Sequence, residues 1–463
     1  MACITVLRML AGADQQFFPT ALVALFAYAM MPVVCPSCRF DPSMPICPRN
    51  LALFIYFVHL VALPLLINFV GPAEGVLPKM PSYYHITIAI ILEILAFISF
   101  CVSYQISANR LPIANRENQG PRDESGLTRF CTAVCLAVGG MGLWCSFGSV
   151  ESLCTYYMDP TRHKMRIDEQ DGTLVGAAGT FFKPFLGFAF VLIWCHWVDQ
   201  RARSSSFGHC LRTTATMAVL VLFGYSTFNY NRGSFVAPLI AMAGVFLARI
   251  QRLPLALILG IGSIVFSFVL LLGVYRSGRM NVQEFSAETK GASHENTQNV
   301  DINSMLQVYG AAPQFLGFLI EQNDDGHLYW GRTLLSSLMF PIPIIGKSFR
   351  ATSGVVIYNE MIYGNTGVLD QIIPFEGELF MNFHLLGIVV GYGILGHVAF
   401  RLQRAFEQSS SAIKCFISIY TAYWILFLIQ GALAVVSQIF VYSFWPICFY
   451  FISKLIFAGM RRA

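Results

Sequence analysis

Long apolar stretches without a charged residue recur along the chain. A helix needs about 20 residues to cross the hydrocarbon core of a bilayer. Six runs without Asp, Glu, Lys or Arg approach or exceed this length: Phe17 to Val34, Leu51 to Gly71, Cys131 to Val150, Thr213 to Asn231, Leu253 to Tyr275 and Leu379 to Phe400. Each run therefore predicts a transmembrane helix.

Further spans bring the predicted total to about eleven, within a range of ten to twelve. Three segments are accepted although each carries one charge or is short: Tyr84 to Ser107, which contains Glu93, Gly172 to Trp197, which contains Lys183, and Gly233 to Ala248. The charge-free stretch from Cys415 to Ser453 is long enough for two spans, and we expect a tight turn near Ser437 and Gln438. The fold class is an all-α polytopic membrane protein.

The amino-acid composition is also typical of an integral membrane protein. Apolar residues make up 56% of the 463 positions and charged residues only 12%, whereas about a quarter of an ordinary globular domain is charged. The 13 cysteines lie mostly in apolar segments, so no disulfide framework is expected. Cys35, Cys38 and Cys47 form one cluster, but structural zinc prefers four ligands and no histidine lies nearby. We expect neither a metal nor a cofactor.

Basic residues set the predicted orientation. Short connections rich in Lys and Arg, which favour the cytoplasmic side, are Arg110 to Arg129, Arg201 to Arg212, Arg249 to Arg252, Arg401 to Lys414 and Lys454 to Arg462. Counting crossings between them places the C-terminus inside. It also divides the one membrane domain into spans 1–8 (residues 1–275), a large extracytoplasmic loop (276–378) and spans 9–11 (379–463).

The outer loop is expected to be helical. Apolar residues between Met305 and Leu319 recur at helical spacing, which predicts an amphipathic helix lying on the membrane surface. Trp330 to Phe340 is apolar but too short to span, and it ends in Pro341-Ile342-Pro343. A helix that touches the interface fits this segment.

Cations on the predicted outer face are the clearest chemical signal. Arg232 lies in a short turn between two spans, Arg276 and Arg279 follow the end of another, and the loop adds Arg332, Lys347 and Arg350. A guanidinium is forked to hold phosphate oxygens through two parallel hydrogen bonds. We interpret the arginines as a diphosphate or acidic-sugar site, and snorkelling to lipid headgroups is the alternative.

Acidic and imidazole side chains at the same face are candidates for a general base. They are His327, Asp370, Glu376, Glu378 and His384. Glu376 and Glu378 lie where the loop returns to the membrane, at the start of a predicted helix. A helix N-terminus also favours a carboxylate for purely structural reasons. Glu93 and Lys183 lie inside predicted spans, where an ionisable group marks either function or a packed, hydrogen-bonded group.

Three stretches resemble the bacterial O-antigen polymerases, the Wzy-type oligosaccharide repeat-unit polymerases. Arg232-Gly233 is similar to the family's Arg-Gly turn. Gly331-Arg332-Thr333-Leu334-Leu335, continuing to Pro341-Ile342-Pro343 and Gly346-Lys347, resembles its helix, proline break and lysine. Glu376-Gly377-Glu378-Leu379-Phe380-Met381-Asn382-Phe383, followed by Gly387, is similar to the segment leading from loop into membrane. His384 and Leu385 depart from this pattern, because a glycine-rich continuation is common there.

The resemblance implies a GT-C-like enzyme of the bacterial cytoplasmic membrane that polymerises polyprenyl-diphosphate-linked repeats into O-antigen, capsule or exopolysaccharide by inverting transfer. It assigns Arg232, Arg276 and Arg279 to the diphosphates, helped by Arg332, Lys347 and Arg350, and Glu376, Glu378 or His327 to catalysis. A flippase and a chain-length regulator are the implied protein partners, and nucleic acid is not one. Two alternatives stay open: an O-antigen ligase, and a lipid-linked oligosaccharide flippase with charges such as Glu93 and Lys183 in mid-membrane.

Overall fold

The computed structural model describes residues 18–72, 77–110, 125–158, 174–226, 232–254, 256–258, 260, 262, 306–308, 310–323, 326–342, 345–364 and 373–460. All regular elements in these ranges are helices. Those before residue 250 are α2 (Phe18–Val34), η1 (Pro36–Cys38), α3 (Pro48–Tyr56), η2 (Phe57–Ala62), α4 (Leu63–Val70), α5 (Tyr83–Arg110), α6 (Ser125–Phe147), α7 (Val150–Met158), α9 (Leu174–Arg201), η3 (Ala202–Ser204), α10 (Phe207–Ser226) and α11 (Arg232–Arg249).

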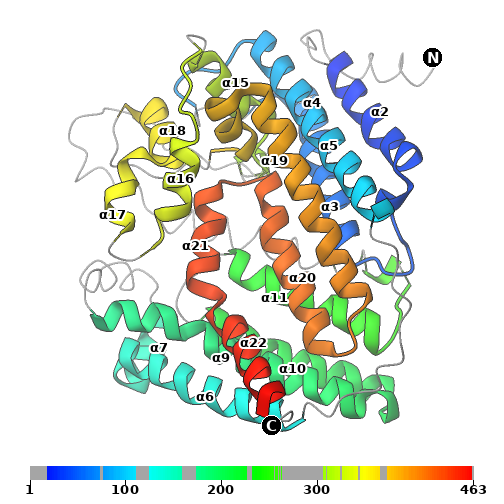
Figure 1. Ribbon diagram of the computed structural model, residues 1–463, viewed down its shortest axis with the longest axis vertical. Coiled ribbons are helices and arrows are strands. Elements are labelled where there is room, and N and C mark those ends of the chain that lie inside the picture. The colour runs from blue at the N-terminus through cyan, green and yellow to red at the C-terminus, as the bar shows by residue number, and fades with distance from the viewer. Residues whose placement is uncertain are drawn as a thin grey trace.

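The later helices begin in the predicted outer loop. They are α15 (Pro313–Gln322), α16 (Arg332–Met339), α17 (Gly346–Phe349), η4 (Arg350–Thr352), α18 (Gly354–Tyr363), α19 (Phe375–Glu407), α20 (Ala412–Leu426), η5 (Phe427–Ile429), α21 (Leu433–Ser443) and α22 (Trp445–Met460). Because α19 begins at Phe375, Glu376 and Glu378 already belong to this helix. The helices α15 to α18 gather at one end of the molecule, and α6, α7, α9 and α10 lie at the other (Figure 1).

Several helices are long and apolar enough to cross a membrane, as the charge-free runs predict. Six such helices occur in the described ranges: Pro48–Val70, Tyr83–Arg110, Ser125–Cys145, Phe207–Tyr225, Phe375–Glu407 and Ala412–Ile429. The bent pair formed by α21 and α22, with an angle of 52°, brings the number to seven if the pair counts as one span. The total of eleven stays a prediction, because parts such as 263–275 lie outside the described residues.

The turn expected near Ser437 lies elsewhere. The helix that begins at Ala412 continues through η5 to Ile429, and α21 begins at Leu433, so the chain turns at residues 430–432. Gly431 lies at this turn. Ser437 lies inside α21, where its hydroxyl donates to the carbonyl oxygens of Ala434 and Ser337. A serine satisfied in this way is compatible with a helix, so the placement of the turn at Ser437 was wrong.

Helices α5 and α19 pack along one another in parallel (Figure 1). The rings of Tyr104 and Phe400 meet edge to face, and a Cβ on Gly396 would lie 2.2 Å from the carbonyl oxygen of Phe100. Only glycine permits this close approach of the two backbones. The ends of α5 and α19 therefore lie on the same side of the molecule.

The outer helix α15 is buried, so it is not the amphipathic surface helix that the spacing predicts. Every residue from Pro313 to Ile320 is buried, because the helix packs against the start of α5. Glu321 fixes this position by accepting hydrogen bonds from Lys79 Nζ at 2.9 Å and from the backbone nitrogen of Ser82 at 3.0 Å. The hydrogen bond from Lys79 holds the pKa of Glu321 below its ordinary value.

The helix α16 turns its polar residues inward. Thr333, Ser336 and Ser337 are buried, whereas Leu335 and Leu338 are about half exposed, at 52% and 48%. This inverted arrangement suits a helix that faces an apolar surrounding such as the edge of a bilayer, as the sequence predicts for this segment.

Candidate functional site

Glu376 lies one residue inside the start of α19 and is 1% exposed. Pro374 precedes the helix and its fixed backbone sets the entry of the chain. The carboxylate accepts a short hydrogen bond from the hydroxyl of Tyr392, which lies further along the same helix beyond a break at Phe383 and His384. The sequence thus places a carboxylate in the interior of the helical bundle at the level where the outer helices begin.

His59 brings two buried carboxylates together. Its Nε2 lies 3.7 Å from Oε1 of Glu93 and 3.7 Å from Oε1 of Glu376, although the three residues come from η2, α5 and α19. Its Nδ1 lies 3.0 Å from the carbonyl oxygen of Gly310. A carbonyl oxygen only accepts, so Nδ1 carries a proton and donates it. We call His59, Glu93, Glu376 and Tyr392 the buried cluster.

The buried cluster brings three groups that can accept a proton close together. If Nδ1 is protonated and the ring is neutral, Nε2 presents a lone pair to two carboxyl groups, and three acceptors would then face one another. A further proton that reaches this place would therefore find three acceptors. Both oxygens of Glu93 and Oε2 of Glu376 have no hydrogen-bond partner in the described part of the chain. Such an arrangement can accept a proton from a reactant and pass it on.

The local backbone around His59 is unusual. Residues Phe57–Ala62 form a π-helix between α3 and α4, and His59 lies in it. A π-helix is rare and occurs mostly at functional sites, because its wider turn redirects side chains that an α-helix would point elsewhere. On the opposite side, Gly310 precedes Ala311, whose φ of 50° is uncommon for a residue with a side chain.

Glu378 has a different environment, because it contacts α16 and α18 of the helices α15 to α18, which we call the outer helices. Its Oε1 accepts a hydrogen bond of 2.5 Å from the hydroxyl of Ser337 on α16. The carbonyl oxygen of Ser337 accepts in turn from Ser437 on α21 at 2.6 Å. A Cβ on Gly354 would lie 2.6 Å from Oε1 of Glu378, so α18 also closes on this carboxylate. The two predicted carboxylates therefore have different environments. Glu376 belongs to the buried cluster, whereas Glu378 connects α19 to α16 and α18.

The predicted cations that the structure describes lie on the outer helices. Arg332 on α16, Lys347 on α17 and Arg350 at the start of η4 are all exposed, and the guanidinium of Arg350 lies 6.0 Å from the centre of the Phe340 ring. His327 is also exposed, and its ring meets that of Tyr329 at 5.0 Å, with no contact to the buried cluster among the described residues.

Other predicted residues cannot be compared in this way. Arg232 is the first residue of α11, but its side chain lies outside the described part of the structure. Arg276, Arg279 and Asp370 lie outside the described residues altogether. Lys183 belongs to α9, and its side chain is likewise not among those described.

His384 occupies a backbone position that suits glycine. Its φ is 48° and its ψ is −142°, and it interrupts α19 together with Phe383. This combination is rare for any residue with a Cβ.

Sequence reasoning missed His59, Tyr392 and their meeting with Glu93. A usable signal exists for His59, because it is the one histidine in the apolar run Leu51 to Gly71, and the rule that singles out Glu93 applies to it equally. Tyr392 carries no such signal. Comparison of the chain with family models, with curated proteins and with solved structures finds no match.

Proposed function

We propose that this chain is a membrane-embedded glycosyltransferase that polymerises polyprenyl-diphosphate-linked oligosaccharide repeats on the outer face of the bacterial cytoplasmic membrane. The observation that carries the proposal is the buried cluster, in which Nε2 of His59 lies 3.7 Å from Oε1 of Glu376 and 3.7 Å from Oε1 of Glu93. The resemblance of the segment from Glu376 to Phe383 to the O-antigen polymerases supports the same reading. The C-terminus then lies in the cytoplasm.

The reaction needs a base and a set of cations. The acceptor hydroxyl attacks the anomeric carbon of the donor sugar, a new C–O bond forms, and the bond from that carbon to the diphosphate oxygen breaks. Glu376 receives the hydroxyl proton and His59 shares it with Glu93. A positioned base contributes typically about 10²- to 10⁴-fold in rate. The diphosphate leaves with its electron pair, and neighbouring cations stabilise its developing charge.

The cations assigned to the diphosphates lie on the outer helices or in segments predicted to face the same side. Arg332 and Lys347 are exposed on α16 and α17, and α16 also packs against α19. Arg232, Arg276 and Arg279 complete the proposed set. Since a diphosphate is a good leaving group, neutralisation by arginine and lysine is sufficient and no nucleotide is needed.

Access to Glu376 requires movement. The carboxylate is 1% exposed in this arrangement, so an acceptor hydroxyl reaches it only if the first turns of α19 part from the helices around them. The break at Phe383 and His384 separates these turns from the rest of α19 and supplies a point about which they can rotate. Such gating motions are common in enzymes that exclude water from the reaction.

A transporter is the second candidate. Glu93 and His59 are ionisable, buried and paired across helices, and intramembrane pairs of this kind also form proton relays in transporters. A lipid-linked oligosaccharide flippase would use the buried cluster to couple proton movement to substrate movement. An O-antigen ligase would share the polymerase chemistry and differ only in its acceptor.

The deciding experiment uses the full-length protein in detergent with lipid-linked oligosaccharides extracted from a strain that lacks this gene. Extension of the lipid-linked glycan is followed by gel electrophoresis. We expect the wild type to produce a ladder and Glu376→Gln to be at least about 100-fold slower. Glu360→Gln is the matched control, because Glu360 is an exposed carboxylate on the outer helix α18 and should retain the full rate.

Three results would reject or redirect the proposal. Full activity of Glu376→Gln would remove the proposed base. Absence of any ladder, together with movement of the same lipid across proteoliposome membranes by the wild type, would establish the transporter instead. Transfer to added lipid A core without a ladder would identify a ligase. A folded Arg232→Ala variant should also lose extension, because that guanidinium belongs to the proposed diphosphate site.

A further inference from the structure

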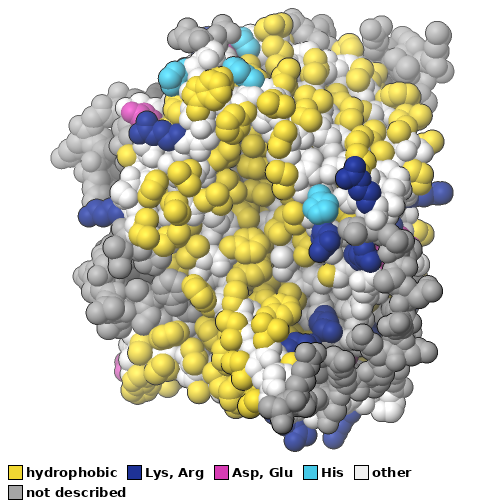
Figure 2. Space-filling view, viewed as in Figure 1, with side chains coloured by type: hydrophobic (Ala, Val, Ile, Leu, Met, Phe, Trp, Pro, Cys, Tyr) yellow, Lys and Arg dark blue, Asp and Glu magenta, His cyan; other side chains and the backbone are white. Residues whose placement is uncertain are grey.

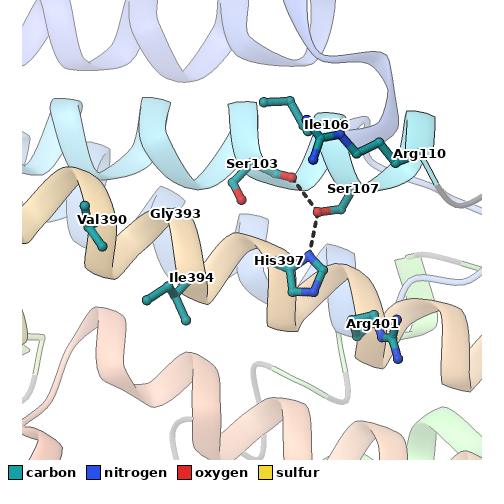
Figure 3. Close-up of a pocket in the computed structure, with 9 residues that line it drawn as sticks. All are labelled: Ser103, Ile106, Ser107, Arg110, Val390, Gly393, Ile394, His397 and Arg401. Carbon is teal, nitrogen blue, oxygen red and sulfur yellow. Dashed lines mark hydrogen bonds between the residues drawn. The ribbon is translucent and has the colours of Figure 1, made fainter.

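A groove with a volume of about 600 Å³ runs between α5 and α19 near their C-terminal ends, away from the buried cluster. Figure 3 shows the groove with Ser103 and Ser107 on α5 facing Gly393 and His397 on α19. Both helices are apolar enough to cross a membrane, so a groove on their outer surface opens toward lipid.

One end of the groove is cationic. Arg110 is the last residue of α5 and Arg401 lies in the last two turns of α19, and both side chains are exposed at the same end (Figure 3). Neither forms a salt bridge within the described part of the chain. Guanidinium groups at the end of a membrane helix reach the headgroup level, where phosphate oxygens are their natural partners.

A hydrogen bond with Ser107 fixes the imidazole of His397 at this end of the groove. The hydroxyl of Ser107 donates to the carbonyl oxygen of Ser103 at 2.8 Å, and it also lies 2.8 Å from Nδ1 of His397. A hydroxyl has one proton, so Nδ1 of His397 must be the donor in the second contact. The ring is thereby fixed at the cationic end of the groove.

The rest of the groove is apolar and open. Ile106, Val390 and Ile394 line it and are 45%, 51% and 61% exposed. Between them lies Gly393, where an added Cβ would approach nothing nearer than Ser103 Cβ at 4.0 Å. The missing side chain leaves room along α19. Figure 2 shows a broad hydrophobic surface on this face of the molecule, bordered on one side by a histidine and several Lys or Arg side chains.

We propose that this groove is a binding site for an anionic glycerophospholipid. The phosphate group lies between Arg110 and Arg401 with His397 beside it, and an acyl chain follows the apolar trough over Gly393. The charge argues for an anionic lipid, because two guanidinium groups without an acidic partner in the described structure complement a net negative headgroup better than a zwitterionic one. This site does not depend on the proposed glycosyl transfer.

The test measures lipid binding to the full-length protein in detergent by native mass spectrometry. Phosphatidylglycerol and phosphatidylcholine with identical acyl chains are titrated separately. We expect phosphatidylglycerol to bind at least about tenfold more tightly. The double variant Arg110→Ala/Arg401→Ala should weaken its binding about 30-fold, the effect expected of two arginines near a headgroup. Arg110→Lys/Arg401→Lys should retain most of the affinity because it keeps both charges.

A matched control removes two other arginines. Arg129 on α6 and Arg212 on α10 are exposed and are predicted to face the same side of the membrane, so Arg129→Ala/Arg212→Ala should change the affinity less than twofold. Gly393→Leu fills the apolar trough without changing either arginine, and it should weaken the binding of phosphatidylglycerol several-fold. This variant provides a second test should the double alanine variant fail to fold.

Several outcomes would overturn the proposal. Equal affinities for the two lipids would show that the protein does not recognise the headgroup charge. Equal losses of phosphatidylglycerol affinity in the two double alanine variants would show that the lipid responds to the overall positive charge and does not bind specifically in the groove. Unchanged binding in Gly393→Leu would place the acyl chain elsewhere. Displacement of phosphatidylglycerol by equimolar polyprenyl phosphate would identify an isoprenoid lipid as the occupant instead.

Discussion

Helices α6, α9 and α10 pack at glycine residues, whereas η2, α5 and α19 also gather ionisable side chains. In the first group, a Cβ on Gly224 would lie 2.5 Å from the Cα of Gly187, and a Cβ on Gly139 would lie 2.5 Å from the backbone nitrogen of Leu186. In the second group, His59 lies 3.7 Å from the carboxylates of Glu93 and Glu376.

The difference shows which part of the molecule is scaffold. Apolar side chains gain little by leaving lipid for protein, so membrane helices associate through close packing at small residues. The glycine contacts of α6, α9 and α10 achieve this without any buried Asp, Glu, His, Lys or Arg among their described side chains. Ionisable groups in the membrane are costly, so those of η2, α5 and α19 are the candidates for a functional role.

The largest effect is expected when Glu93 is replaced by leucine. Both carboxylate oxygens of Glu93 are buried without a hydrogen-bond partner among the described residues, so Glu93→Leu should stabilise the fold by about 1–3 kcal/mol. Glycan extension should fall at least about 100-fold, because the buried cluster loses the carboxylate to which His59 is proposed to pass the proton. Thermal unfolding and the extension assay measure the two changes. Unchanged extension would show that the carboxylate is only a packed group.

The glycine contacts give the converse prediction. Gly224→Leu places a side chain against the backbone of α9, which cannot move aside, and overpacking of this kind costs about 1–3 kcal/mol or more. We expect lower thermal stability in fluorescence-detected size-exclusion chromatography, with activity lost only in proportion to folded protein. Gly208→Leu is the control on the same helix, because a Cβ there would meet nothing within 4 Å. Similar losses in both variants would remove the packing argument.

The sequence was informative about where helices lie. The apolar run Leu51 to Gly71 corresponds to α3, η2 and α4, and the run Leu379 to Phe400 lies within α19. Length and absence of charge are local properties, so they can be read from the chain directly. The burial of α15 could not be read in this way, because it depends on contacts with α5, and the helical spacing of its apolar residues says nothing of what covers its other side.

The candidate site was predicted only in part. Glu376 was singled out because it lies where loop meets membrane, a position visible in the sequence. Its pairing with His59 and Glu93 joins three segments far apart in the chain, and no local pattern reports such a meeting. The different role of Glu378 depends on its hydrogen bond with Ser337 of α16, and α16 approaches α19 only in the folded protein.

A smaller effect is expected at the break in α19. His384→Gly should stabilise the fold by about 1 kcal/mol, because glycine adopts a φ of 48° without the strain that a Cβ imposes. Thermal unfolding of the purified protein measures the change. Phe383→Gly is the neighbouring control, and it should destabilise because its φ of −143° is open to any residue and its ring is lost. A lower stability of His384→Gly would mean that the imidazole makes a compensating contribution.

The smallest effect is expected at the contact that holds α15 against α5. Glu321→Gln should cost no more than about 1 kcal/mol near neutral pH, because Lys79 is 74% exposed and exposed ion pairs contribute little. The pKa of Glu321 is lowered in the folded state, so its contribution is present above the ordinary carboxyl pKa and disappears as pH falls through the folded value. Unfolding measured from pH 7 to pH 3 should show the two proteins converge. A difference that grows in acid would contradict this assignment.

The π-helix at Phe57–Ala62 has a consequence for how this span can vary. Removal of one residue there would allow an uninterrupted α-helix that is still apolar enough to insert into a bilayer. The flanking helices α3 and α4 would keep nearly the same rotation relative to one another, because a π-helical turn holds about one residue more than an α-helical turn, but the side chains inside the turn, including His59, would point elsewhere. Insertion into the membrane and the aim of the imidazole are thus separately encoded, and a single-residue change in length can abolish one while sparing the other.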